Sequence, residues 1–409
     1  MKEKLFPITR SLTGDGVRQT LKILQQEADF DINELPTGTD VFDWEVPKEW
    51  NIRGARLENE HGVVADMKDT NLRVVGYSEP VNREMAYKEV EPHLHTHPYA
   101  IPYRTSYYKR DWGFCMTDKE KNKLDKNSIY YANVDSTLEQ GSMTYGEVLL
   151  PGKSDREYLI TTYSCHPSMY NDNVSGMIVW ARLLKQMQQE KTNHGYHFFI
   201  GPETLGVLSL LKRKSDFDGA LVINCVGRNE DFVLKKSFKE SSEVDRVALQ
   251  TFKEMEIRYT TVPFSVNGSD ERQLSSPSYR IPTINITRGG YYGTDWYHNS
   301  RDVYHDRTSF LGVGDMELNR SVEVYFNVLM NLDRNHKIFS LQTHGEPMLG
   351  KRNLYPATGG KNEADHTATI AKWIMHEDGS DLLKVAEKTG FDMKEISKVY
   401  DQLRKERLI

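Results

Sequence analysis

The sequence predicts an α/β fold in which helices cover both faces of a largely parallel mixed sheet. Residues 159–163, the run LITTY, are apolar and β-branched, as in buried strands. An apolar-periodic segment typical of a helix begins directly after Gly176. Such strand-like and helix-like segments alternate from residue 126 to about residue 350. Repeated units of this kind imply parallel strands with helices on both faces.

The first 40 residues are expected to open this core. Val17, Leu21 and Leu24 lie at helical spacing in an amphipathic segment. The sequence pattern changes over residues 41–125, where short runs of alternating apolar and polar residues are interrupted by frequent prolines. This pattern predicts a small β-rich domain inserted into the core.

The core is expected to resume at residue 126 and to continue to residue 350. Strands are expected at residues 128–134, 141–150, 159–163, 196–200, 220–226, 259–266 and 282–287. Helices are expected from residue 176 and at residues 203–211, 242–255 and 316–332.

Residues 351–409 are expected to form a separate helical domain. Ala386, Gly390 and Ile396 have the spacing of a helix-turn-helix unit, in which the small residue lets two helices meet and the glycine makes the turn. Basic and acidic residues nearly cancel there, which makes nucleic acid an unlikely partner and favours docking or assembly of identical chains through this domain.

Composition excludes several protein classes. The chain has 409 residues, 27% of them charged and 38% hydrophobic, which is typical of a soluble globular protein of two or three domains. The net charge of -6 argues against a general nucleic-acid binder. Three widely spaced cysteines predict no disulfide framework, and we see neither a signal peptide nor a membrane span. We therefore expect a cytoplasmic protein with no membrane partner.

A histidine and an aspartate follow the strand at residues 159–163. Pro167 should end that strand, so His166 and Asp172 lie on the loop at its carboxyl end, where open α/β sheets bind ligands. An imidazole and a carboxylate six residues apart on one turn can face the same divalent ion. The alternative is that the two residues only cap a loop.

Other polar groups follow later strands. Glu203 opens a helix at the sheet edge, where it can act as a general base or simply interact with the helix dipole. Residues 267–273 place three charged groups on one loop, for which a solvated turn is the alternative. His298 lies in an aromatic setting and is followed by Asp302, so it is either another ligand with an oriented partner or a packed histidine.

The order of these residues resembles the zinc aminopeptidase family that includes bacterial leucyl aminopeptidases and glutaminyl cyclases. The matching residues are His166, Asp172, Glu203, Asp270 and His298. The resemblance implies that His166, Asp172 and His298 bind metal, that Glu203 is the catalytic base, and that Asp302 is the aspartate of the final motif.

Two positions depart from that family. Thr204 stands where a second glutamate is expected, and Asn224 stands where a later aspartate is expected. Neutral oxygens bind a dication less well than carboxylates do. We therefore expect one zinc ion per chain, held by His166, Asp172 and His298, with water in the fourth position.

A closer resemblance covers nearly the whole chain. The segments FPITRSLTGDGVRQTL, TDVFDWEVPKEWNIRGA, SCHPSMYNDNVSG, SDERQLSSP and GEPMLGKRNLYP resemble a bacterial aminopeptidase-like family. Members have a peptidase core, a small inserted domain and a C-terminal winged-helix-type domain, and often lie near polysaccharide-biosynthesis genes. The resemblance implies a link to cell-surface glycan assembly.

Together these observations predict metal-dependent hydrolysis of an amide bond in a peptide or small molecule, with removal of an N-terminal residue. The candidate substrate-binding residues are Asp270, Glu271, Arg272, Arg288 and Tyr292. The alternatives are an amidase or deacylase that acts on an amino-sugar precursor, and a catalytically degenerate binding or scaffold protein.

A rival metal site is conceivable at His93, His95 and His97, because alternate residues of a strand share one face. A polar loop before Pro98 is the favoured interpretation of that stretch.

Overall fold

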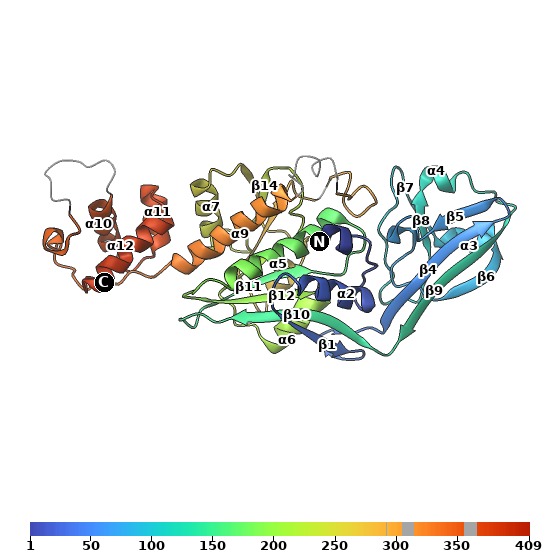
Figure 1. The fold of residues 1–409 in the computed structure, drawn as a ribbon, viewed down its shortest axis with the longest axis horizontal. Helices are drawn as coiled ribbons and strands as arrows, with labels where there is room; N and C mark the ends of the chain where they lie inside the picture. Colours follow the sequence, from blue (N-terminus) through green and yellow to red (C-terminus); the bar gives the residue numbers. More distant parts are fainter. Residues whose placement is uncertain (292, 305–314, 356–365) are drawn as a thin grey trace.

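The computed structural model describes residues 1–291, 293–304, 315–355 and 366–409. Three parts follow one another along its long axis (Figure 1): a β-rich domain, a central α/β core and a group of C-terminal helices. The predicted fold class is confirmed, since the core is an eight-stranded mixed sheet flanked by helices. None of the helices in these ranges combines the length and apolarity that crossing a membrane requires.

The large sheet has the strand order β1-β10-β12-β11-β13-β16-β14-β15. Its strands are Asp31–Pro36 (β1), Ser142–Leu150 (β10), Gly195–Gly201 (β12), Glu157–Tyr163 (β11), Gly219–Val222 (β13), Thr283–Arg288 (β16), Phe232–Lys235 (β14) and Tyr259–Val262 (β15). The four central strands β12, β11, β13 and β16 are parallel, whereas β10 and β14 run antiparallel to them. The carboxyl ends of the four central strands therefore meet at one edge of the sheet.

Successive side chains of the central strands enter two different apolar layers. Ile160 of β11 packs in a layer with Trp180 and Tyr325, whereas its neighbour Leu159 packs in a layer with Leu208. The first layer contains side chains from Asp15–Leu24 (α2), Gly176–Met187 (α5), Glu243–Glu254 (α7) and Met316–Arg334 (α9). The second contains side chains from Leu205–Arg213 (α6) and Glu271–Leu274 (α8). Burial on both faces explains why these strands are continuously apolar.

The inserted domain is built on a four-stranded sheet with the order β5-β4-β9-β6. Its elements are β4 (Glu49–Asn59), β5 (Gly62–Asp66), β6 (Val81–Ala86), α3 (Tyr87–Val90), β7 (Leu94–His97), β8 (Phe114–Thr117), α4 (Asp118–Lys121) and β9 (Ile129–Glu139). A short hairpin of β2 (Asp40–Val41) and β3 (Trp44–Glu45) precedes this sheet. The strand predicted at residues 128–134 belongs to this domain and not to the core, because β9 pairs with β4 and β6. The boundary expected at residue 126 therefore moves to the end of β9.

Three helices form the C-terminal part: α10 (Thr367–His376), α11 (Leu382–Thr389) and α12 (Met393–Lys405). Gly390 ends α11 with a φ of 77°, a conformation that favours glycine, and so makes the turn into α12. Leu382 and Ile396 lie in the same apolar layer as Leu329 of α9, and Arg246 of α7 forms an ion pair with Asp381. The helices therefore pack directly on the core. Assembly of identical chains through them stays a prediction.

Two strands of the large sheet escape sequence prediction. β1 has the polar sequence DINELP, and β14 has only four residues, so neither shows a clear period. β13 ends at Val222, four residues before its predicted end, because the chain there leaves the sheet to form the loop that carries Asn224.

Arg18 of α2 links the core to the root of the inserted domain. Its guanidinium donates to Glu34 of β1 at 2.8 Å, to Glu49 at the start of β4 at 2.7 Å, and to Ser142 of β10 at 3.0 Å. The hydrogen bonds from Arg18 hold the pKa of Glu49 down at about 2.

We predict that Arg18→Ala lowers the free energy of unfolding by about 1 kcal/mol at pH 7, because it removes a partly exposed charge network. The pKa of Glu49 is lowered in the folded chain, so this contribution is present above its ordinary value of 4.5 and is lost as the pH falls towards about 2. Urea denaturation at pH 7 and pH 3 measures both effects, with Arg53→Ala as an exposed-pair control. A deficit that is as large at pH 3 as at pH 7 would refute the assignment.

Candidate metal centre

The carboxyl edge of the central strands gathers the predicted site residues. His166 and Asp172 follow β11, Glu203 follows β12, and His298 lies on the segment after β16. His166 and Asp172 are buried, with exposed fractions of 4% and 0%, whereas His298 is partly exposed. Parallel neighbours bring these loops together although more than 130 residues separate His166 from His298 in the chain.

The loop between β11 and α5 is held by Asp302. Its carboxylate accepts hydrogen bonds from the backbone N–H groups of Asn171 at 2.7 Å and Asp172 at 2.8 Å. The peptide bond between Asp172 and Asn173 is cis. Burial raises the pKa of Asp302 to about 7. Asp302 therefore fixes the backbone that presents Asp172.

His166, Asp172 and His298 offer ligand atoms that all lie within 4.8 Å of one another. Asp172 Oδ2 lies 2.9 Å from His298 Nε2, yet this buried oxygen has no aligned hydrogen-bond donor. Burial lowers the pKa of His166 to about 4, so its imidazole is neutral, as metal ligation requires. Two imidazoles and a carboxylate are a donor set that suits zinc.

The charge of Asp172 is stabilised from several sides. Burial opposes its ionisation, but His166, His298 and the hydroxyl of Tyr163 outweigh that effect and hold its pKa at about 2. Tyr163 donates to Asp172 Oδ1 at 2.6 Å, and the side-chain amide of Asn224 donates to the Tyr163 hydroxyl at 3.2 Å. One oxygen of Asp172 is thus engaged by protein, and the other faces the histidines.

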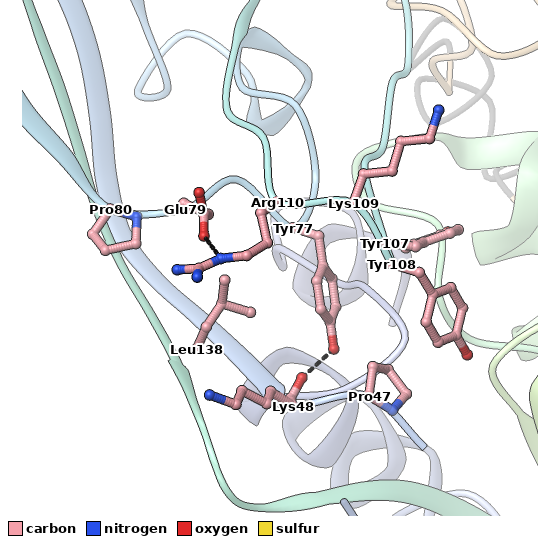
Figure 2. A pocket seen from close by; sticks show the side chains of 10 residues that line it. All are labelled: Pro47, Lys48, Tyr77, Glu79, Pro80, Tyr107, Tyr108, Lys109, Arg110 and Leu138. Carbon is pink, nitrogen blue, oxygen red and sulfur yellow. Dashed lines mark hydrogen bonds and ion pairs between the residues drawn. The ribbon is translucent and has the colours of Figure 1, made fainter. Parts of the chain in front are cut away.

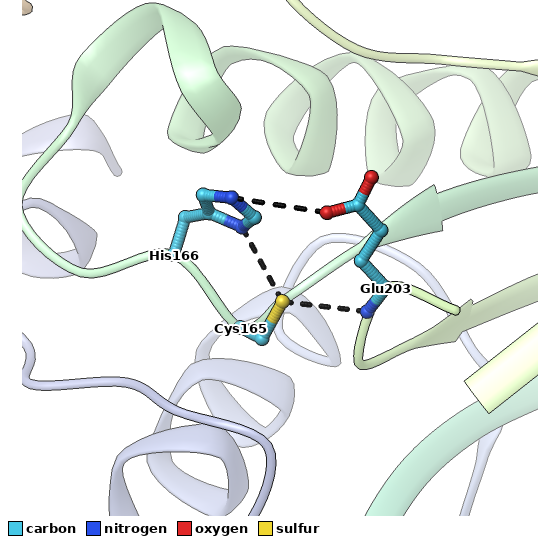
Figure 3. Close-up of side chains that lie close together, drawn as sticks. All are labelled: Cys165, His166 and Glu203. Carbon is cyan, nitrogen blue, oxygen red and sulfur yellow. Dashed lines mark hydrogen bonds and ion pairs between the residues drawn. The ribbon is translucent and has the colours of Figure 1, made fainter. Parts of the chain in front are cut away.

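Glu203 lies beside His166 (Figure 3). Its Oε2 is 3.8 Å from His166 Nε2, and its backbone N–H donates to the sulfur of Cys165 at 3.3 Å. The same sulfur lies 3.3 Å from His166 Nδ1. Burial, with the neighbouring charges of Asp270 and Asp172, raises the pKa of Glu203 well above its usual range. Cys165, a residue that sequence analysis did not single out, therefore joins the histidine loop to the glutamate loop.

Thr204 stands where the resembled family has a carboxylate, and its polar groups are hydrogen-bonded within the protein. Its backbone N–H donates to Asp270 at 2.7 Å, and its hydroxyl accepts from the guanidinium of Arg272 at 3.0 Å. Asp270 and Arg272 are therefore close to Glu203, and their part in substrate binding stays a prediction.

Two other predicted substrate-binding residues are not at the centre. Glu271 is fully buried in an ion pair with Lys235 at 2.7 Å. Arg288 forms an ion pair with Glu317 and donates to the backbone of Glu230. These charges are paired within the protein, and a part for either residue in substrate binding stays a prediction. Tyr292, the last candidate, lies outside the described residues.

The rival histidine site does not form. His93 belongs to a short turn before β7, where its ring stacks on Trp112 with centroids 3.9 Å apart. His97 instead accepts a hydrogen bond from the backbone of Tyr99. Across the described ranges, the groups of three side chains that could hold a metal ion all contain His166.

The inserted domain contributes residues that sequence analysis missed. The backbone N–H of Tyr103 donates to the carbonyl of His298 at 2.8 Å, and Pro102 forms a β-bridge with Asn299. The Tyr103 ring lies 5.1 Å from the His166 ring and 5.4 Å from the His298 ring, centroid to centroid. The one sequence signal was an aromatic cluster between prolines, which gives no hint of a contact almost 200 residues away.

Backbone strain surrounds the centre. Thr204, Cys225 and His298 have positive φ angles of 67°, 51° and 56°, each of which costs a non-glycine residue about 1–3 kcal/mol. Such residues persist only where their surroundings hold them, and they cluster at functional sites.

Comparisons with known proteins show the family of the chain. Residues 1–335 match the family described as a domain of unknown function (DUF4910), and residues 337–409 match a winged helix-turn-helix family. A Clostridium acetobutylicum protein named for polysaccharide biosynthesis and an aminopeptidase-like domain is 38% identical, over 100% of this chain and 94% of its own length.

Solved structures extend the comparison. The crystal structure of a protein from Clostridium acetobutylicum, titled as a peptidase, has a TM-score of 0.87 and 37% identity, covering 100% of this chain and 94% of that one. A zinc aminopeptidase from Bacillus subtilis has a TM-score of 0.56 at 9% identity, covering 81% and 94%, and therefore shares the fold. The chain belongs to the aminopeptidase-like DUF4910 family and carries a C-terminal winged helix-turn-helix domain.

Proposed function

We propose that the chain is a zinc-dependent hydrolase of amide bonds. Its substrate is a peptide, from which it removes the N-terminal residue, or a small molecule with an amide bond. The observation that carries the proposal is the convergence of His166, Asp172 and His298 beside Glu203 at the carboxyl edge of a parallel sheet. The aminopeptidase fold of the neighbours supports the same reaction class.

The three ligand residues fit one dication. They supply two imidazole nitrogens and one ionised carboxylate, and Asp172 Oδ2 is a buried anionic oxygen without an aligned donor. When bound, zinc polarises a substrate carbonyl and lowers the pKa of water.

Glu203 is suited to move the proton. It lies beside His166, and burial raises its pKa towards neutrality, where a general base can both accept a proton and return it to the leaving amine. Arg272, held at Thr204, supplies a positive charge next to this glutamate for substrate orientation.

A second ion is disfavoured by hydrogen bonding. A bridging carboxylate needs both oxygens, but Asp172 Oδ1 accepts from Tyr163, which Asn224 supports in turn. Thr204, at the other altered position, is likewise engaged, with Asp270 and Arg272. Internal hydrogen bonds thus engage Thr204, whereas Asn224 donates through Nδ2 to Tyr163 and its buried Oδ1 has no hydrogen-bond partner.

An amidase or deacylase that acts on an amino-sugar precursor is the second candidate. The relative named for polysaccharide biosynthesis favours it. Parallel assays with aminoacyl p-nitroanilides and N-acetylated amino sugars separate the two substrates. A degenerate scaffold would neither hydrolyse these compounds nor bind zinc.

We predict one tightly held zinc ion per chain. His166→Ala and His298→Ala should retain none, because each removes one of three protein ligands. Elemental analysis after gel filtration of zinc-saturated protein provides the count, and His61→Ala, whose side chain is 64% exposed, is the control. Two retained ions in the unaltered chain would show that other acids complete a second site.

We predict that Glu203→Gln keeps the zinc ion and loses about 10²–10⁴-fold in hydrolysis rate, because only proton transfer is removed. Glu190→Gln, an exposed glutamate, should match the unaltered chain. Metal content and rate are measured on the same samples. Loss of zinc from Glu203→Gln would make this residue a ligand and end its assignment as the base.

A further inference from the structure

A cavity of about 440 Å³ lies at the root of the inserted domain (Figure 2). Lys48 lies directly before β4, Leu138 is on β9, and Tyr77 and Tyr107 come from the loops between the strands. Its volume is within the range of about 300–1,000 Å³ that is typical of small-molecule sites. Nothing in the proposed reaction uses this cavity.

The cavity is connected to the metal centre by tyrosines. Tyr107 lines it, and the Tyr107 hydroxyl lies 3.0 Å from the hydroxyl of Tyr103. Tyr103 in turn packs against the rings of His166 and His298. Tyr107 and Tyr103 therefore form a chain of contacts from the cavity to the candidate metal ligands.

The tyrosines of the aromatic wall differ in exposure: Tyr108 is 49% exposed and Tyr107 is partly exposed, whereas Tyr77 is 2% exposed. The Tyr77 and Tyr107 rings meet edge to face with centroids 6.0 Å apart, and Tyr77 stacks on Trp50. The hydroxyls of Tyr77 and Tyr108 donate to backbone carbonyls, so these groups are already satisfied. Tyr77 and Tyr107 have positive φ angles of 69° and 30°, which cost free energy. These backbone conformations persist only because the surrounding packing supports them.

The polar part of the cavity is mainly cationic. Arg110 pairs with Glu79, and this pair offers a donor and an acceptor side by side. Lys48 also lines the cavity and has no acidic partner within ion-pair distance among the described residues, whereas the Lys109 side chain points away from these groups (Figure 2). Two cations against one carboxylate leave an excess of positive charge, which favours an anionic ligand.

We propose that this cavity binds an acidic saccharide unit. A sugar ring has apolar C–H faces that can lie on the rings of Tyr107 and Tyr108. Its hydroxyls both donate and accept, as the pair of Arg110 and Glu79 requires. A sugar carboxylate would meet the unpaired ammonium of Lys48. A peptide is the poorer match, because peptide sites use an exposed strand edge or an apolar groove for a helix. This assignment rests on the proposed function. It implies that the substrate is an amide that carries an acidic sugar.

The test is titration of the full chain carrying Glu203→Gln with glucuronic acid, followed by calorimetry or ligand-observed NMR at low salt. Binding should weaken about tenfold in Tyr107→Ala and in Lys48→Met, which keeps the apolar stem and leaves the backbone contact of Tyr77 intact. Tyr99→Ala and Lys123→Met, exposed positions of the same domain, are the matched controls. Glucose, which lacks the carboxylate, should bind more weakly, and added salt should weaken glucuronic acid.

Three outcomes would overturn the proposal: equal binding of glucose and glucuronic acid, tighter binding of an acidic dipeptide, or no effect of either cavity variant. Because Glu203→Gln is not expected to turn over substrate, the titration is independent of hydrolysis. Sugar binding without any amide hydrolysis by the unaltered chain would refute the proposed function and leave the cavity assignment standing. Peptide hydrolysis without sugar binding would refute the cavity assignment and leave the proposed function standing.

Discussion

An ionised carboxylate removed from water costs several kcal/mol unless it is paired, and Asp172 lies fully buried at the centre of the site. Its two oxygens are treated differently, since Tyr163 donates to one while the histidines face the other. Asp302 holds the backbone beneath it. This single charge therefore sets the positions of the loops after β11 and β16.

Under the proposed function, the reaction class and the substrate range depend on different parts of the chain. The sheet edge of the core supplies the candidate ligand residues and Glu203, whereas the inserted domain supplies the tyrosine wall. Because loops on a rigid scaffold change more readily than the scaffold does, a fold shared at 9% identity is compatible with a different substrate.

Sequence patterns were sufficient for the parallel core and for the residues at its edge. His166, Asp172 and Glu203 each follow a long apolar strand, and parallel strands end at the same edge. Sequence patterns failed for features that depend on tertiary contacts alone. The alternating pattern of β9 is the same whether it pairs with β4 or with the large sheet, and Arg288 is an exposed-looking cation until Glu317 is brought to it. Tyr103 reaches His298 only through the docking of two domains.

The hydrogen bond from Tyr103 to the carbonyl of His298 has a thermodynamic consequence. If docking of the inserted domain orders the loop that carries a metal ligand, the free energy by which docking strengthens ion binding equals that by which the bound ion strengthens docking. Ion occupancy and domain closure then form one reciprocal equilibrium. Loss of the ion would loosen the far end of the molecule, and a mutation in the β-rich domain could lower the affinity for an ion that it never touches.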